Sequence, residues 1–215
     1  VSTAVIFDLD GTLLDTIEDI GTSTNHVLEG RGLAIHDTAA YRQMVGKGIK
    51  ELLLQAVPPS HHDQLDVIIE EFRAHYWEHL LVESKLFDGI REMLAELSAR
   101  KIPKAILSNK PHRFTRKITD QLFDVGEFVE VFGHRDHVAR KPDPSSALEL
   151  ATILEVATKD IYFVGDSPVD METASGAGMH PIGVSWGYQP PAALDAAGAE
   201  HILSSPAALL ERVRS

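Results

Sequence analysis

Five short apolar runs recur along the chain, separated by segments in which apolar residues have helical spacing. The runs lie at residues 4–7, 104–107, 127–132, 161–164 and 181–184. Continuous runs of this length are typical of strands that are buried on both faces. Strands that alternate with helices favour a parallel sheet with helices on both sides. We therefore predict an α/β fold with a doubly wound parallel sheet, a Rossmann-like core.

Residues 16–82 break this alternation. No strand pattern occurs there, and the apolar residues follow helical spacing, as in Ile17, Ile20 and Val27. A stretch of this length is too long for an ordinary connection within a compact domain. We expect two domains: an α/β core formed by residues 1–15 and 83–215, and an inserted α-helical cap formed by residues 16–82.

Composition argues against several classes of function. The chain has 215 residues, with 20 Lys+Arg against 32 Asp+Glu and a net charge of −12. This balance does not favour nucleic-acid binding, although a local basic patch can still bind an anionic substrate. Because the sequence has no cysteine, thiol nucleophiles, iron–sulfur clusters and thiolate zinc sites are excluded.

No apolar run approaches the roughly 18 residues of a membrane span, and residues 1–7 are too short for a signal peptide. We therefore expect a cytoplasmic protein without a membrane partner.

The segment 8–13, with the sequence DLDGTL, directly follows the first predicted strand. It places Asp8 and Asp10 at the carboxyl end of that strand, where parallel sheets bind ligands. Two carboxylates at this spacing can take different roles, since one can attack as a nucleophile while the other acts as general acid and then base. Gly11 lets the backbone turn sharply, so that nearby N–H groups can bind phosphate oxygens.

Three later segments supply groups that complement these two acids. Ser108 and Asn109 follow a strand, Lys141 precedes a predicted helix start, and Asp166 and Asp170 follow another strand. Together with the first segment, the two later acids can offer carboxylate oxygens to Mg²⁺, a hard cation that prefers oxygen ligands. Lys141 and the Ser108 hydroxyl can neutralise and orient phosphate oxygens. The set predicts phosphoryl transfer.

In their order and spacing, the four segments resemble the motifs of the haloacid dehalogenase superfamily, and the resemblance covers the whole chain. It implies that Asp8 is the nucleophile that forms an aspartyl-phosphate. It also implies that Asp10 protonates the leaving alcohol and ligates Mg²⁺ through its backbone carbonyl. Dehalogenases of the superfamily lack an acid at the position of Asp10, and the phosphonatase branch has a small residue there. The resemblance therefore points to the phosphatase branch.

The same resemblance implies roles for further residues. Ser108 would bind phosphate, and Lys141 would steady the nucleophile and the phosphate. Asp166 would ligate Mg²⁺, and Asp170 would support the metal shell. The expected substrate-binding residues are Gly11, Thr12, Lys47 and Asn109.

Within the phosphatases, the stretches 45–48, 108–111 and 183–188 resemble phosphoglycolate phosphatases. Residues 38–50 carry Arg42, Lys47 and Lys50 without an acid, which suits a second anionic group on the substrate, although such a stretch can also be a solvated helix face. We expect a small phosphorylated metabolite as partner, with 2-phosphoglycolate as the substrate. Other functions stay open: a pyrophosphatase, a sugar-phosphate phosphatase, a mutase or a non-catalytic phosphate-binding protein. The oligomeric state, monomer or homodimer, also stays open.

Overall fold

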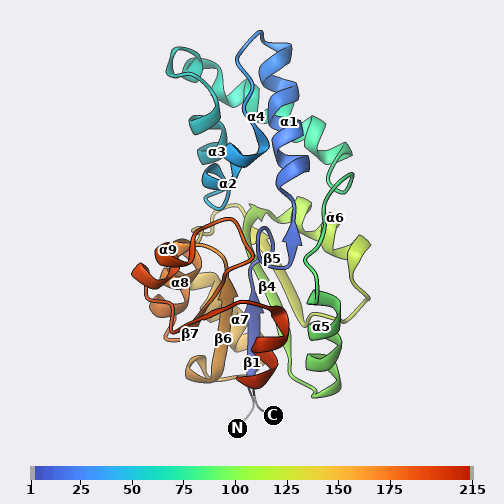
Figure 1. Cartoon of the computed structure of the whole chain (residues 1–215), viewed down its shortest axis with the longest axis vertical. Helices are drawn as coiled ribbons and strands as arrows, with labels where there is room; N and C mark the ends of the chain where they lie inside the picture. Colours follow the sequence, from blue (N-terminus) through green and yellow to red (C-terminus); the bar gives the residue numbers. More distant parts are fainter. Residues whose placement is uncertain (1–2, 214–215) are drawn as a thin grey trace.

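Six strands form one parallel sheet in the computed structural model, which describes residues 3–213 of the chain (Figure 1). Their order across the sheet is β5-β4-β1-β6-β7-β8. The strands are β1 (Ala4–Phe7), β4 (Lys104–Pro111), β5 (Glu130–His134), β6 (Ile161–Gly165), β7 (His180–Val184) and β8 (His201–Leu203). Because every pairing is parallel, the carboxyl ends of all six strands meet at one edge of the sheet.

The predicted strands at 4–7, 104–107, 161–164 and 181–184 are confirmed. Strand β4 continues to Pro111, however, so Ser108 and Asn109 lie within it and do not follow it as predicted. The predicted start of a strand at residue 127 is wrong. Gly126 has a φ of 82°, and the N–H of Glu127 closes a turn onto the carbonyl of Asp124, so β5 begins only at Glu130. Strand β8 was not predicted, because it has only three residues and begins with a polar one, which is too short for a recognisable strand pattern.

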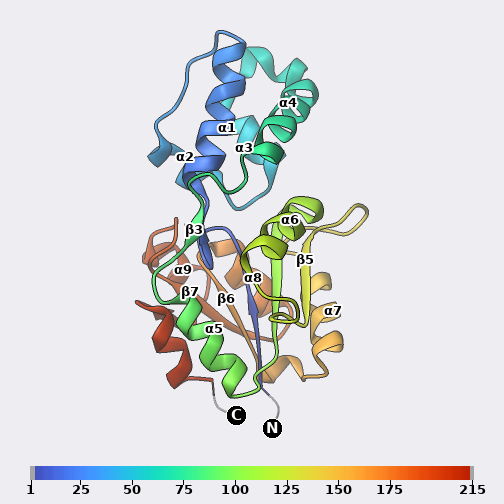
Figure 2. The ribbon, with the colours of Figure 1, turned by 90° about the vertical axis from the view of Figure 1, so that its right-hand side faces the viewer.

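Helices cover both faces of this sheet (Figure 2). The helices of this layer are α5 (Ile90–Ala99), α6 (His112–Leu122), α7 (Ser145–Leu154), α8 (Pro168–Gly176) and α9 (Pro191–Ala196), with 3₁₀ turns η2 (Thr158–Asp160) and η3 (Pro206–Glu211). In β1, Val5 and Phe7 pack into a core with α5 and α6, whereas Ala4 and Ile6 pack into a second core with α7 and α8. The doubly wound α/β fold is confirmed.

In the sequence, the pairs Asp143-Pro144 and Ser167-Pro168 each predict an N-cap residue followed by the first residue of a helix, and the two predictions had different outcomes. Ser167 is the N-cap of α8 and Pro168 its first residue, as predicted, and Asp170 completes a capping box. The predicted pair of Asp143 as N-cap and Pro144 as first residue is wrong by one position, because Pro144 is itself the N-cap of α7. The Asp143 carboxylate instead accepts a hydrogen bond from the N–H of Ser145, at 2.9 Å.

A separate group of helices lies beyond the carboxyl edge of the sheet (Figures 1 and 2). It comprises α1 (Ile17–Gly30), α2 (Thr38–Met44), α3 (Ile49–Ala56), η1 (Pro59–Gln64) and α4 (Leu65–Glu78). The chain enters and leaves this group through the antiparallel strands β2 (Leu14–Asp15) and β3 (Lys85–Leu86). The group therefore stands over the strand ends that carry the predicted site.

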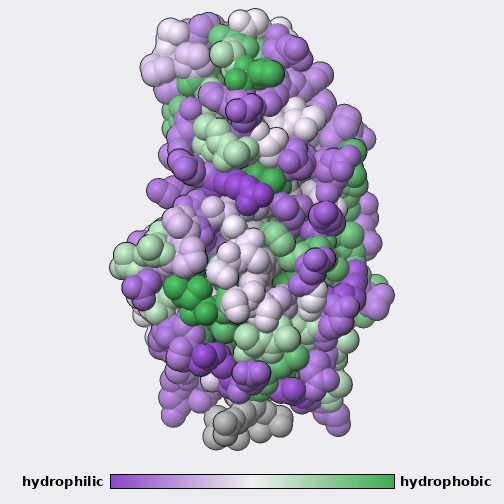
Figure 3. Space-filling view, in the orientation of Figure 1, coloured by the Kyte–Doolittle hydropathy of each residue, from purple (hydrophilic) through white to green (hydrophobic). Residues whose placement is uncertain are grey.

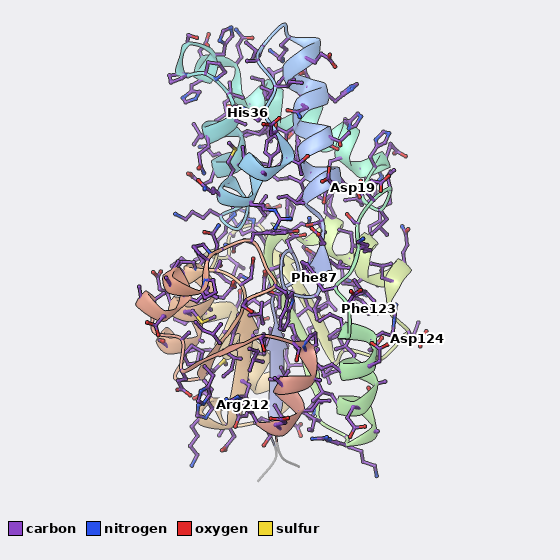
Figure 4. All side chains as sticks on the ribbon, in the orientation of Figure 1. Asp19, His36, Phe87, Phe123, Asp124 and Arg212 are labelled. Carbon is purple, nitrogen blue, oxygen red and sulfur yellow. The ribbon has the colours of Figure 1, made fainter. Side chains whose placement is uncertain are left out.

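Two sets of contacts join the helical group to the neighbouring parts of the chain. The buried Asp19 carboxylate of α1 accepts hydrogen bonds from the N–H groups of Val82, Glu83 and Ser84, in the segment that returns to the sheet (Figure 4). The Trp77 ring of α4 also lies 4.0 Å from the ammonium of Lys117 in α6.

The surface in the view of Figure 3 is mostly hydrophilic, and apolar side chains form small separate patches. Among the helices described for residues 3–213, none combines the length and the apolar character that a membrane span requires. The outer ends of the predicted core domain, residues 1–2 and 214–215, lie outside the described residues.

Candidate active site

The carboxyl edge of the sheet brings together most of the predicted site residues. Asp8 directly follows β1, Asp166 directly follows β6, and Ser108 lies within β4. These side chains converge because β1 lies between β4 and β6. Lys141 joins them from the loop between β5 and α7, and all four residues are buried.

Lys141 forms two buried ion pairs at the centre of this site. Its Nζ lies 2.7 Å from Asp8 Oδ1 and 2.6 Å from Asp170 Oδ1. Burial alone would lower the pKa of Lys141, but the carboxylates of Asp170 and Asp8 outweigh it and raise this pKa above its usual value. Asp170 is held in turn by the N–H and hydroxyl of Ser167, at 3.1 and 2.6 Å from its Oδ2. Asp170 thus positions the ammonium of Lys141 against Asp8.

Asp8, Asp166 and Asp170 form a cluster of buried acids whose nearest carboxylate oxygens all lie within 4.8 Å of one another. Burial raises the pKa of Asp8 to about 7, with Lys141 opposing this shift and Asp170 adding to it. Burial, and then the charges of Asp8 and Asp170, also raise the pKa of Asp166. One ammonium is therefore too little positive charge for three buried carboxylates.

A divalent cation with oxygen ligands fits this donor set, and Mg²⁺ is such a cation. Both oxygens of Asp170 already accept hydrogen bonds from Lys141 and Ser167. Asp8 and Asp166 each bond through one oxygen only among the described residues, to Lys141 and to Tyr188. Asp8 and Asp166 are thus the better direct ligands, and Asp170 acts through Lys141.

Asp10 is held by two donors through a single carboxylate oxygen. Its Oδ1 accepts a hydrogen bond from the Thr16 hydroxyl at 2.7 Å and lies 2.8 Å from the ammonium of Lys110. In the part of the chain that the structure describes, no hydrogen bond uses Asp10 Oδ2. This oxygen can therefore exchange a proton with a ligand while the other one fixes the side chain.

Glycines allow two backbone segments to approach Asp166. Gly11 has a φ of 85°, and a Cβ atom placed on Gly11 or on Gly187 would overlap the Asp166 side chain. The N–H of Tyr188 donates to Asp166 Oδ2 at 2.7 Å. The sharp turn predicted at Gly11 is confirmed, and the segment after β7 is part of the site.

Asn109 links the helical group to the site. Its Nδ2 donates to the carbonyls of Gly46 and Lys141, and its Oδ1 accepts from the N–H of Lys141 at 2.9 Å. The side-chain amide is thus occupied by protein groups and positions the backbone of Lys141. Ser108 lines the cavity, as a phosphate ligand requires. The buried Thr12 Oγ1 has no hydrogen-bond partner among the described residues.

A cavity of about 50 Å³ lies between the strand ends and the helical group. Asp8, Asp10, Tyr76 and Lys110 contribute polar groups to its wall. Apolar side chains of the helical group form much of the rest: Ile20, Val45, Ile49, Leu52 and Phe72. Lys47, the predicted ligand from this group, is exposed and lines a neighbouring groove instead, so the cavity wall does not include it.

Sequence reasoning missed Thr16, Tyr76, Lys110 and Tyr188 as members of the site. Lys110 and Tyr188 stand inside the stretches 108–111 and 183–188, which carry the resemblance to phosphoglycolate phosphatases and could have drawn attention to them. Tyr76 follows the apolar spacing of α4, a pattern that indicates only burial. Its position in the site depends on how α4 packs over β4.

A carboxylate at a strand end, held by a buried lysine and flanked by an acid with one available oxygen, is suited to nucleophilic hydrolysis in an α/β fold. The sequence model of the haloacid dehalogenase-like hydrolase family matches residues 5–184. The chain belongs to this family, and the resemblance inferred from the four segments is confirmed.

Named relatives cover nearly the whole chain. It is 30% identical to the phosphoglycolate phosphatase of Chromobacterium violaceum over 217 residues, which cover 99% of this chain and 96% of that protein. It is 33% identical to the N-acetylmuramic acid 6-phosphate phosphatase of Pseudomonas aeruginosa, covering 97% of this chain and 93% of that protein. A crystal structure described as a predicted phosphoglycolate phosphatase from Haemophilus somnus aligns with a TM-score of 0.92 at 26% identity, covering 99% of this chain and 98% of that one.

Proposed function

We propose that this chain is a Mg²⁺-dependent phosphatase that hydrolyses a small phosphomonoester, 2-phosphoglycolate, through an aspartyl-phosphate. The observation that carries the proposal is the arrangement around Asp8, a buried carboxylate held 2.7 Å from the ammonium of Lys141 at the end of β1. Asp10 lies two residues further on, with one carboxylate oxygen available for proton transfer. Family membership supports the same activity.

In the first step, a carboxylate oxygen of Asp8 attacks the phosphorus atom, and the bond between phosphorus and the ester oxygen breaks. Asp10 Oδ2 gives its proton to the departing alkoxide, so that the product leaves as an alcohol. Lys141 and the Ser108 hydroxyl stabilise the negative charge on the phosphoryl oxygens.

In the second step, Asp10 takes a proton from a water molecule, which attacks the phosphorus of the aspartyl-phosphate and releases phosphate and free Asp8. When bound by Asp8, Asp166 and the carbonyl of Asp10, Mg²⁺ would neutralise charge on the transferring phosphoryl group. The capped helix start of α8 keeps Asp170, and through it Lys141, in place during both steps.

The cavity favours a small leaving group. A cavity needs about 10–15 Å³ to hold one water molecule. The cavity of about 50 Å³ therefore has room for only a few groups of that size. A two-carbon leaving group is closer to this size than an N-acetylated sugar. Relatives named phosphoglycolate phosphatase support the small substrate, and the relative named N-acetylmuramic acid 6-phosphate phosphatase supports a sugar phosphate as the second candidate.

A substrate panel with Mg²⁺ tests the proposal through the ratios of kcat/KM. It contains 2-phosphoglycolate, N-acetylmuramic acid 6-phosphate, glucose 6-phosphate and pyrophosphate. We expect the highest kcat/KM for 2-phosphoglycolate, complete loss in excess chelator, and recovery with Mg²⁺. Full activity in excess chelator would contradict the metal requirement, and a higher kcat/KM for a sugar phosphate would replace the substrate.

We also propose that residues 16–82 act as a cap domain over a core formed by residues 1–15 and 83–215. The placement of α1 to α4 over the strand ends supports this division. A small phosphorylated metabolite in the cytoplasm is the proposed partner. Removing residues 16–82 and joining the core by a short linker should retain hydrolysis of p-nitrophenyl phosphate and abolish the preference for 2-phosphoglycolate. Equal preference with and without these residues would contradict the division of roles.

A further inference from the structure

Lys110 is a buried cation inside the cavity that the two-step reaction does not use. Of the residues between 3 and 213 that line the cavity, it is the only cationic one. Its side chain is 5% exposed, and its ammonium lies 2.8 Å from Asp10 Oδ1 and 2.8 Å from Tyr76 Oη. Burial alone would lower the pKa of Lys110, but Asp10 and Tyr76 outweigh it and raise this pKa above its usual value. The ammonium thus keeps its charge in an apolar surround.

Two hydrogen-bond donors at this point have no acceptor within the described part of the chain. The ammonium of Lys110 has three N–H groups, and Asp10 and Tyr76 take two of them. Tyr76 accepts from Lys110, so its own proton stays available. Burial raises the pKa of Tyr76 to about 12, and its hydroxyl therefore remains protonated. A ligand in the cavity meets both donors together.

The distance between Asp10 and Lys110 matches the size of 2-phosphoglycolate. Asp10 must come within about 3 Å of the ester oxygen to protonate it. The Lys110 ammonium, at 2.8 Å from the same carboxyl group, is then on the order of 5 Å from that oxygen. In 2-phosphoglycolate, one methylene separates the ester oxygen from the carboxylate, whose oxygens can close most of this gap.

We propose that Lys110 and the hydroxyl of Tyr76 bind the carboxylate of the substrate's leaving group and so select a 2-phosphorylated short-chain acid. The inference rests on the proposed phosphatase function and deepens it. It moves carboxylate recognition from Lys47, which is exposed outside the cavity, to a buried pair on β4 and α4. Apolar neighbours such as Ile20 and Phe72 strengthen such a bond by excluding water.

The test compares 2-phosphoglycolate with 2-hydroxyethyl phosphate, which carries a hydroxymethyl group in place of the carboxylate. The variants are Lys110→Met, which removes the charge, and Tyr76→Phe, which removes only the hydroxyl. Lys117→Met is the matched control, because Lys117 also contacts an aromatic residue of α4, Trp77, but lies outside the cavity wall. The readout is the ratio of kcat/KM for the two substrates, with the melting temperature of each variant as a check on folding.

Charge-assisted hydrogen bonds to a carboxylate predict that Lys110→Met lowers this ratio by about 10- to 100-fold, and that Tyr76→Phe lowers it by about 3- to 10-fold. Lys117→Met should leave the ratio unchanged. Equal losses on both substrates in Lys110→Met would show that Lys110 serves only Asp10 and would overturn the inference. If Lys110→Met does not fold, Tyr76→Phe decides alone, and an unchanged ratio in it also overturns the inference. A wild-type protein that does not prefer 2-phosphoglycolate would instead refute the proposed substrate.

Discussion

Substituting Asp19 by alanine should loosen the segment through which the chain returns from the helical group to the sheet layer. Asp19 lies in the first turn of α1 and is 3% exposed. Its carboxylate accepts hydrogen bonds from three consecutive backbone N–H groups and from the hydroxyl of Ser84, with distances between 2.6 and 3.1 Å. One side chain therefore holds residues 82–84 in a fixed position.

The expected loss of stability follows from the number of these bonds and from their exposure. A hydrogen bond to a charged group contributes about 1.5–3 kcal/mol. Because Val82 is 62% exposed and Glu83 is also exposed, water can replace the carboxylate at their N–H groups. We therefore count about two of the four bonds and expect Asp19→Ala to lower the free energy of unfolding by about 3 kcal/mol. For a chain of this length, that is a drop of roughly 6–12 °C in melting temperature.

Thermal unfolding and amide hydrogen exchange together measure this effect. Glu18→Ala is the control, because Glu18 occupies the same first turn with the same charge but is exposed. Asp19→Ala should melt well below the control and should exchange the amides of residues 82–84 faster. Melting temperatures within about 1 °C of each other, with equal exchange at these amides, would refute the role given to Asp19.

Two further predictions concern buried charge and pH. Lys141→Met should lower the free energy of unfolding of the metal-free protein by about 3–5 kcal/mol, because Asp8 and Asp170 then stay buried without a cation. Denaturant unfolding measures this change, and a loss below about 1 kcal/mol would contradict the prediction. Burial, together with the stacked rings of His26 and His79, lowers the pKa of His75. Since the folded state then binds fewer protons than the unfolded state, His75 makes stability fall as pH drops below about 6.5. His75→Gln should make the free energy of unfolding depend less on pH in this range, whereas the control His61→Gln should not. Equal pH profiles of unfolding in His75→Gln and in the unsubstituted protein would contradict the prediction.

Much of the reacting centre could be predicted because it depends on sheet topology. Asp8 and Asp166 each follow an apolar run, and parallel strands bring such positions to one edge whatever the loops between them do. Lys141 is 133 residues from Asp8 in sequence, yet their pairing could be expected from motif order. The roles assigned to these residues stay predictions until they are measured.

Contacts that depend on how the helical group packs could not be predicted in the same way. Tyr76 meets Lys110 only because α4 lies over the end of β4, and the apolar spacing of α4 indicates burial without naming the neighbour. The acid-free basic stretch around Lys47 predicted this residue as a substrate ligand. A charge pattern, however, does not indicate which residues of a turn line a cavity. In the sequence, Asp19 is indistinguishable from other acids in the first turn of a helix. Its hydrogen-bond partners lie 63–65 residues further along the chain.

The central claim is that Asp8 carries the phosphoryl group during turnover, and acid quenching with radiolabelled substrate tests it most directly. The enzyme is mixed with ³²P-labelled 2-phosphoglycolate and Mg²⁺, quenched in acid, and digested to locate the label. We expect the label on the peptide that contains Asp8, removable by hydroxylamine, and absent from Asp8→Asn. Asp10→Asn should accumulate more label with p-nitrophenyl phosphate, because this leaving group needs no proton whereas the attacking water still needs a base. Turnover without label on Asp8, or label on another residue, would contradict the account.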